Sequence, residues 1–302
     1  MSDKLKGTVF SLIAATGYAS VYIIARFAQR YVTTDVFLPW WFLMASIYST
    51  TILLIRKEFG RFLKSIRKHK FFFIYFGLSE SVGTFTFFYL LRIMNPSVIS
   101  FVSNLSPVAV AFWGFLILRE KLTGMETFGG LVAVSGVLLI SRASPGGELV
   151  KILVVVLMVM FFAFNTVLVR IKVRGEIPPI YIVSLRTYAL FAVYFAYHVL
   201  KNGAIIFPEP HAIPYIVVGS LIGPVAATFS VIHALQYLKA ADVSIIKSVQ
   251  PLLVSLGSYL FLGQSPTKEQ FIGGLLIIVS VNIVILGNRE VIKDQLPEEP
   301  CE

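Results

Sequence analysis

The chain has 302 residues, of which 57% are hydrophobic and only 14% are charged. Charged residues make up about a quarter of an ordinary soluble domain, so this composition, with a mean hydropathy of +0.81, excludes a water-soluble protein. The formal net charge is +10, but the chain has no soluble basic face on which nucleic acid could lie. The excess charge should instead report how the chain is oriented in a membrane.

Ten apolar runs of about 20 residues, the length that crosses about 30 Å of hydrocarbon as a helix, follow one another along the chain. The predicted spans are 7–28, 36–55, 71–92, 96–118, 124–141, 151–171, 178–200, 214–238, 240–262 and 269–287. The first run is longer than the apolar part of a signal peptide, so we interpret it as a retained span. The predicted fold class is an all-α polytopic membrane protein with ten transmembrane helices.

Lysine and arginine gather on one side of these spans, with 17 in the segments on the N-terminal side and six on the other. This bias places both termini in the cytoplasm and the chain in the cell inner membrane as a multi-pass protein. Between residues 56 and 70, Phe59, Phe62, Leu63 and Ile66 share one helical face opposite several cations. They predict a short interfacial helix that anchors the chain on lipid headgroups.

The chain also matches itself at an offset of 144 residues, which aligns the third to fifth spans with the eighth to tenth. Among the matched positions are Thr84 and Thr228, Pro107 and Pro251, Thr123 and Thr267, and Gly129-Gly130 and Gly273-Gly274. Each half therefore holds five spans, an odd number, so the second half enters the membrane with the opposite orientation. The predicted organisation is two inverted five-helix repeats, residues 1–145 and 146–287, followed by a disordered cytoplasmic tail, residues 288–302.

The stretch from Asn104 to Val137, and its partner from Gln250 to Leu286, resemble the end of an EamA domain of the drug/metabolite transporter superfamily. The resemblance covers two tandem halves and implies a ten-helix carrier with a central cavity that opens alternately to each side. The second half departs from the pattern, since Gly263-Gln264 replaces Arg119-Glu120. The acidic turn of the first half is thus not duplicated.

Three charged side chains lie deep within the predicted spans, where an ionisable group is costly unless it is paired or hydrated, whereas Arg26 lies near the end of the first span and is expected to extend to the headgroups. Glu80 lies near the middle of the third span among small and hydroxyl residues. It could bind a substrate ammonium, exchange a proton, or simply pair with Arg186 or Lys247 to hold helices together. Arg186 and Lys247 lie about 10 Å from the cytoplasmic ends of their spans, where they either share a water-filled chamber or extend back to the headgroups.

Prolines at matched positions predict a kink in the fourth span of each half. Pro107 and Pro251 lack the backbone donor and clash with the carbonyl four residues earlier, that of Ser103 or Lys247. Asn104 and Gln250 are polar residues that could meet the freed carbonyls. Kinked, polar segments near a repeat axis are typical of a carrier's substrate site, although a kink that serves only packing is the alternative.

Several aromatic residues complete the candidate cavity. Tyr18, Tyr22, Trp113 and Tyr188 lie deep enough in their spans to form its walls, but no spacing rule separates them from packing residues. Trp40 and Trp41 open the second span near the outer face and are expected in the aromatic belt. The paired glycines of the fifth and tenth spans are interpreted as sites of close helix packing.

These features favour a secondary transporter that exports small organic metabolites such as amino acids. A carrier of phosphorylated or other anionic metabolites is the alternative, since the spans hold two cations against one anion. A channel is disfavoured by the inverted kinked repeats, and an intramembrane enzyme by the absence of hydrolase and metalloprotease motifs. Cys301 is the single cysteine, and we expect no metal or cofactor. Transport could be coupled to protons, and the sequence is compatible with a monomer and with a homodimer.

Overall fold

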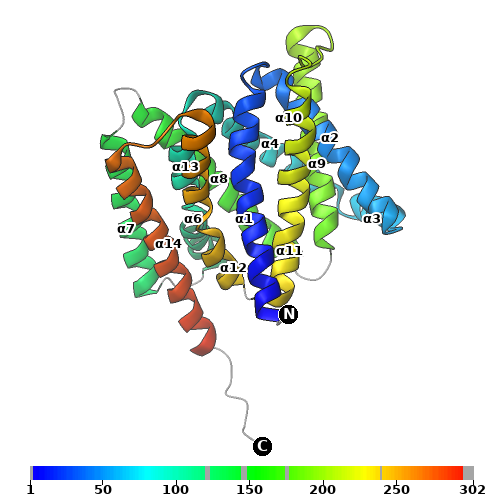
Figure 1. Ribbon diagram of the computed structural model, residues 1–302. Coiled ribbons are helices and arrows are strands. Elements are labelled where there is room, and N and C mark those ends of the chain that lie inside the picture. Colours follow the sequence, from blue (N-terminus) through cyan, green and yellow to red (C-terminus); the bar gives the residue numbers. More distant parts are fainter. Residues whose placement is uncertain (1–2, 120–122, 144–147, 174–176, 239, 295–302) are drawn as a thin grey trace, which may run out of the picture.

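The computed structural model describes residues 3–119, 123–143, 148–173, 177–238 and 240–294. These residues form helices and no strand. Ten segments within them are long and apolar enough to cross a bilayer, which confirms the all-α fold with ten spans. The start of α1 and the end of α14 lie on the same side of the bundle (Figure 1).

Five spans and one additional helix make up the first half. The elements are α1 (Asp3–Ala28), α2 (Thr34–Ile55), α3 (Phe59–Lys68), α4 (Lys70–Ile93), α5 (Pro96–Ser103), α6 (Ser106–Trp113), the π-helical segment η1 (Gly114–Leu118) and α7 (Gly124–Arg142). The fourth span is divided among α5, α6 and η1. The additional helix, α3, lies where the interfacial helix was expected, and its Phe62 is buried against α9.

The second half has the same five spans without an interfacial helix. Its elements are α8 (Glu148–Val173), α9 (Pro179–Asn202), α10 (Ile213–Ser220), the π-helical segment η2 (Leu221–Ala227), α11 (Thr228–Tyr237), α12 (Ala240–Lys247), α13 (Gln250–Leu262) and α14 (Lys268–Asp294). Helix α14 extends to Asp294 and so includes residues 288–294, the first part of the predicted tail. The rest of the predicted tail, 295–302, lies outside the described residues.

The helix starts repeat at the offset of 144 residues. At the start of α7, the Thr123 N–H donates to Glu126 Oε2 at 2.8 Å and the Glu126 N–H donates to Thr123 Oγ1 at 3.0 Å. Thr267 and Gln270 form the same two bonds at the start of α14, at 3.0 and 3.2 Å. Such a capping box satisfies two backbone donors that a helix N-terminus would otherwise leave unpaired.

The preceding spans end alike despite different residues. Arg119 and Gly263, at matched positions, both adopt the left-handed conformation, with φ of 55° and 65°. Their N–H groups donate to Gly114 O and Ser258 O, which are also matched. Glycine adopts this conformation without strain, whereas arginine does not. The turn geometry is therefore duplicated even though the acidic sequence is not.

Close packing of α7 against α14 joins the two halves at one edge of the bundle (Figure 1). A Cβ atom added to Gly136 would lie 2.7 Å from the carbonyl oxygen of Gly273, and one added to Gly273 would lie 2.7 Å from that of Gly136. Gly129 faces Ser280 in the same way. Since Gly129 matches Gly273 and Gly136 matches Ser280 in the repeat, each contact is the two-fold image of the other.

The start of α2 and the end of α9, two helices that line the cavity described below, are tied together by a polar cluster. Lys201 Nζ lies 3.1 Å from Asp35 Oδ1. The buried His198 ring has its Nδ1 atom 3.1 Å from the Asp35 carbonyl oxygen, and its Nε2 atom accepts the Ile206 N–H at 2.9 Å. Because Nε2 accepts, the neutral ring carries its proton on Nδ1 and donates it to Asp35 O.

Substituting a glycine in the α7–α14 contact should separate the two helices. We expect Gly136→Ala to lower the apparent melting temperature of the detergent-solubilised protein by several degrees, because the new methyl group meets backbone rather than a flexible side chain. Thermal unfolding of the purified chain measures this.

Gly130→Ala is the matched control, because a Cβ atom there would meet nothing within 4 Å. Its effect should be neutral or stabilising by up to about 1 kcal/mol, the difference in helix propensity. Equal losses of stability in the two variants would contradict the packing described here.

Candidate functional site

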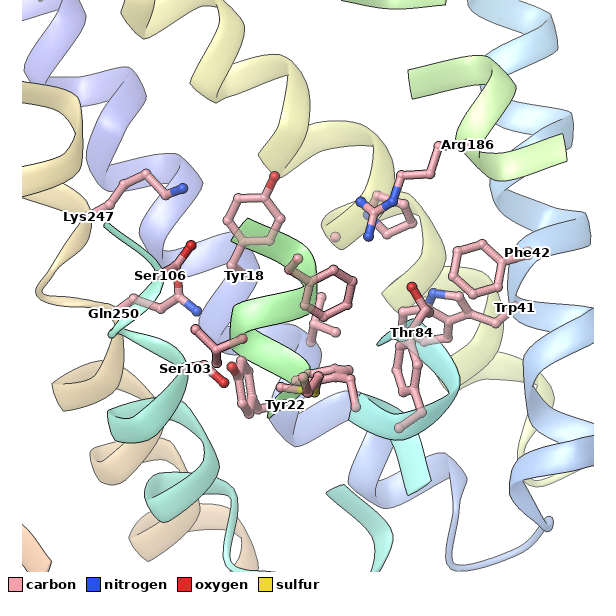
Figure 2. Close-up of a pocket in the computed structure, with 18 residues that line it drawn as sticks. Tyr18, Tyr22, Trp41, Phe42, Thr84, Ser103, Ser106, Arg186, Lys247 and Gln250 are labelled. Carbon is pink, nitrogen blue, oxygen red and sulfur yellow. The ribbon is translucent and has the colours of Figure 1, made fainter. Parts of the chain in front are cut away.

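A cavity of about 360 Å³ lies between the two halves of the chain (Figure 2). Helices α1, α2, α4, α5 and α6 of the first half and α8, α9, η2, α12 and α13 of the second contribute to its wall. The lining residues are Tyr18, Val21, Tyr22, Trp41, Phe42, Thr84, Phe87, Phe88, Ser103, Ser106, Met158, Val159, Phe162, Arg186, Gly223, Pro224, Lys247 and Gln250. The cavity is thus a joint product of both repeats.

The broken fourth spans supply two matched pairs of lining residues. Helix α5 ends at Ser103 and α12 ends at Lys247, and the following helices begin at Ser106 and Gln250. The first two positions differ by 144 residues, and so do the second two. All four line the same cavity, so the repeat axis passes close to it.

The breaks follow from the prolines that begin the next helices. Pro107 and Pro251 occupy the first turns of α6 and α13, where the missing N–H is tolerated. The residues just before α6 and α13, Leu105 and Val249, keep right-handed helical backbone angles. Each span therefore bends without reversing, and the residues at the bend face the cavity.

One of the two cations at the cavity is paired. Arg186 Nε donates to Glu80 Oε2 at 2.8 Å, and the Glu80 side chain is 9% exposed against 37% for Arg186. Glu80 is absent from the lining, whereas Arg186 belongs to it. The carboxylate therefore holds the guanidinium from behind and leaves its terminal nitrogens free to face the cavity.

The second cation, Lys247, has no carboxylate partner among the residues that the structure describes. Its Nζ atom lies 5.0 Å from the centre of the Tyr18 ring, within cation–π range. The Tyr18 hydroxyl is bonded to Thr228 Oγ1 at 3.0 Å, which fixes the ring. Figure 2 shows Lys247 and Arg186 on opposite sides of the cavity with Tyr18 between them.

Aromatic rings form much of the cavity wall. The ring of Phe88 lies 5.7 Å from that of Trp41 and 6.4 Å from that of Phe42. Tyr22 packs edge-on against Phe87 at 5.1 Å. These rings pack against one another as well as lining the space, so they form a preorganised apolar surface.

Five predicted site residues meet at this cavity: Tyr18, Tyr22, Arg186, Lys247 and Gln250. They come from α1, α9, α12 and α13, which the sequence alone could not place next to one another.

Four other predicted site residues do not line the cavity. Glu80 lies behind Arg186, and Asn104 lies in the bend, where its buried Nδ2 atom has no hydrogen-bond partner among the described residues. Trp113 turns to α8 and donates its Nε1–H to the Met160 carbonyl oxygen at 2.8 Å. The Tyr188 hydroxyl is bonded to that of Thr50, on the far side of α9 from the cavity residues.

Sequence reasoning missed several lining residues, chiefly Trp41, Phe42, Thr84 and Phe88. Trp41 was expected in the aromatic belt, but it is only 1% exposed, since Gly219 leaves room for its ring. Trp40 lies near the start of α2, where its Nε1–H donates to the Ile206 carbonyl oxygen at 3.0 Å. Thr84 did carry a signal, because it matches Thr228 in the repeat.

The comparisons with known proteins agree with this architecture. The family model described as "EamA-like transporter family" matches twice, over residues 5–142 and 149–286. A solved crystal structure superposes with a TM-score of 0.66 at 18% identity, over 94% of this chain and 99% of that one, which shows a shared fold. No curated protein matches the chain significantly in sequence.

The Glu80–Arg186 pair should behave as one unit in stability. Glu80→Gln and Arg186→Gln are each expected to destabilise the chain by about 1–3 kcal/mol, because either leaves a charge without its partner at membrane depth. The double variant should lose less than the sum of the two. Thermal unfolding of the four proteins measures the coupling.

Glu126→Gln serves as the matched control, since the second half already has Gln270 at the equivalent capping position. It should leave stability nearly unchanged. Strictly additive losses at Glu80 and Arg186 would show that the pair is not coupled.

Proposed function

We propose a function from the premise that this chain belongs to the EamA-like transporter family. The chain is a membrane-embedded transporter, and our proposal is that it moves a small organic metabolite through the cavity between its two halves. Transport proceeds by alternating access, with the halves rearranging about a central site. The site lies within one chain, so one copy suffices to form it.

The observation that carries the proposal is the pair of matched positions at the bends. Ser103 and Ser106 of the first half and Lys247 and Gln250 of the second line one cavity. In an inverted repeat, exchanging the conformations of the two halves turns an opening on one side into an opening on the other. Residues on the repeat axis keep contact with the substrate in both states.

The chain supplies no means of using ATP, since its sequence lacks a P-loop. The energy must come from a gradient, either of the substrate or of a coupled ion such as a proton. In this proposal Glu80 takes up the proton, which weakens its hold on Arg186. Coupling by this route would link protonation of Glu80 to the positive charge of Arg186 that faces the substrate.

The candidate substrates are amino acids and other metabolites with an acidic group. A carboxylate or a phosphate can be met by Lys247, which has no protein counter-ion among the described residues. The proposed setting is the inner membrane with both termini in the cytoplasm, and the proposed direction is export. The charge bias of the loops supports the proposed orientation of the termini.

Counterflow in proteoliposomes tests the proposal. Vesicles loaded with unlabelled amino acids, organic acids or phosphorylated metabolites should accumulate the labelled substrate transiently, and the rate should saturate. Lys247→Ala should lower the rate at least about tenfold, because the cavity loses its uncompensated charge. Sidedness of uptake and its response to a pH gradient report direction and coupling.

Lys268→Ala is the control, since Lys268 is exposed and is the first residue of α14, at the end of that helix opposite the proposed cytoplasmic tail. Its rate should equal that of the unchanged chain. Absence of counterflow across the whole panel would refute a carrier, and flux that neither saturates nor shows countertransport would identify a channel instead.

A further inference from the structure

The charges around the cavity add up to a single uncompensated cation. Arg186 and Lys247 line it, and Glu80 cancels the charge of Arg186 through the 2.8 Å bond to Nε. Among the residues that the structure describes, no aspartate or glutamate lines the cavity. A buried charge is stable when it is paired, so the site is complementary to a ligand with one negative charge.

A ligand ammonium finds no counter-ion in the same space. The nearest carboxylate, Glu80, is behind the guanidinium and already engaged. An amino acid in the cavity would therefore bring an ammonium group without a counter-ion there, while its carboxylate engages Lys247. The charges favour an acid without an amino group, because like charges in a desolvated site repel strongly.

The cavity wall divides into a polar end and an aromatic end. In Figure 2, Lys247, Ser106, Gln250 and Ser103 lie together on one side. On the other side lie the rings of Trp41 and Phe42, which pack against further rings, together with Thr84 and the paired Arg186. A carboxylate at the polar end would place the body of the ligand against the rings, and a volume of about 360 Å³ suits a small molecule of this kind.

We infer that the substrate is an aryl monocarboxylate, a planar apolar body that carries one acidic group and no ammonium. Lys247 binds the carboxylate with help from Ser103, Ser106 and Gln250, and the rings of the aromatic end bind the body. Glu80 is a positioning residue that acts through Arg186 and sets the number of negative charges that the site accepts. This inference rests on the proposed function, because it names the substrate class of the same cavity.

Three probes that each carry a phenyl ring separate the alternatives. Phenyllactate has a hydroxyl where phenylalanine has an ammonium, and phenyl phosphate carries close to two negative charges near neutral pH. Binding to the intact detergent-solubilised chain is measured by ligand-induced thermal shift, which needs no transport. Phenyllactate should bind at least about tenfold more tightly than phenylalanine or phenyl phosphate. Tighter binding of either competitor would overturn the inference.

Two variants test the charge assignment. Lys247→Gln should lose binding of phenyllactate at least about tenfold, whereas Lys268→Ala should keep it. Glu80→Gln raises the charge that faces the cavity from one to two, and it should shift the preference toward phenyl phosphate about tenfold. If Glu80 had only a structural role, Glu80→Gln would lower the affinity for all ligands by the same factor. An unchanged ratio of the affinities for phenyllactate and phenyl phosphate would therefore refute a role of Glu80 in selectivity.

The two proposals fail in different ways. Binding of phenyllactate without counterflow would support the proposed substrate class and refute the proposal that the chain is a carrier. Saturable counterflow of phenylalanine without binding of phenyllactate would support the proposal that the chain is a carrier and refute the proposed substrate class.

Discussion

A proline within a membrane span leaves one carbonyl without its helical donor, and Pro107 and Pro251 impose this constraint at matched positions of the two halves. The affected carbonyls belong to Ser103 and Lys247, the last residues of α5 and α12. Irregular backbone at membrane depth is stable only where protein or water can satisfy it. The bends therefore require a polar space beside them, and the cavity between the halves is that space.

The two-fold relation between the halves determines where the cavity lies, while the residues that differ between the halves determine its charge. Capping boxes, left-handed helix ends and the reciprocal glycine contacts of α7 and α14 recur at one offset. The charges do not recur. Lys247 matches Ser103, and Glu80 matches Pro224, so a symmetric scaffold holds an asymmetric set of charges. Such a scaffold can change access symmetrically and still bind one kind of ligand.

Hydropathy and self-alignment were sufficient for the architecture, because a bilayer imposes span length and the repeat preserves helix ends. They were insufficient for the wall of the cavity. All faces of a membrane helix are apolar, so periodicity does not reveal which face turns inward. Tyr18 and Tyr188 looked equivalent in the sequence, yet one lines the cavity and the other bonds Thr50. Trp41 turns inward only because a glycine on α10 accommodates its ring.

The central claim is that the bends of the two halves face a site open to each side in turn, and labelling of a single cysteine tests it most directly. Replacing Cys301 by serine leaves no thiol in the chain, and Ser106→Cys then places one on the cavity wall. Membrane-impermeant maleimide is applied to vesicles of each orientation, with and without a ligand that binds the cavity. The account predicts labelling from both sides, slowed by the ligand in each case. Labelling from one side only, under every substrate gradient, would contradict it.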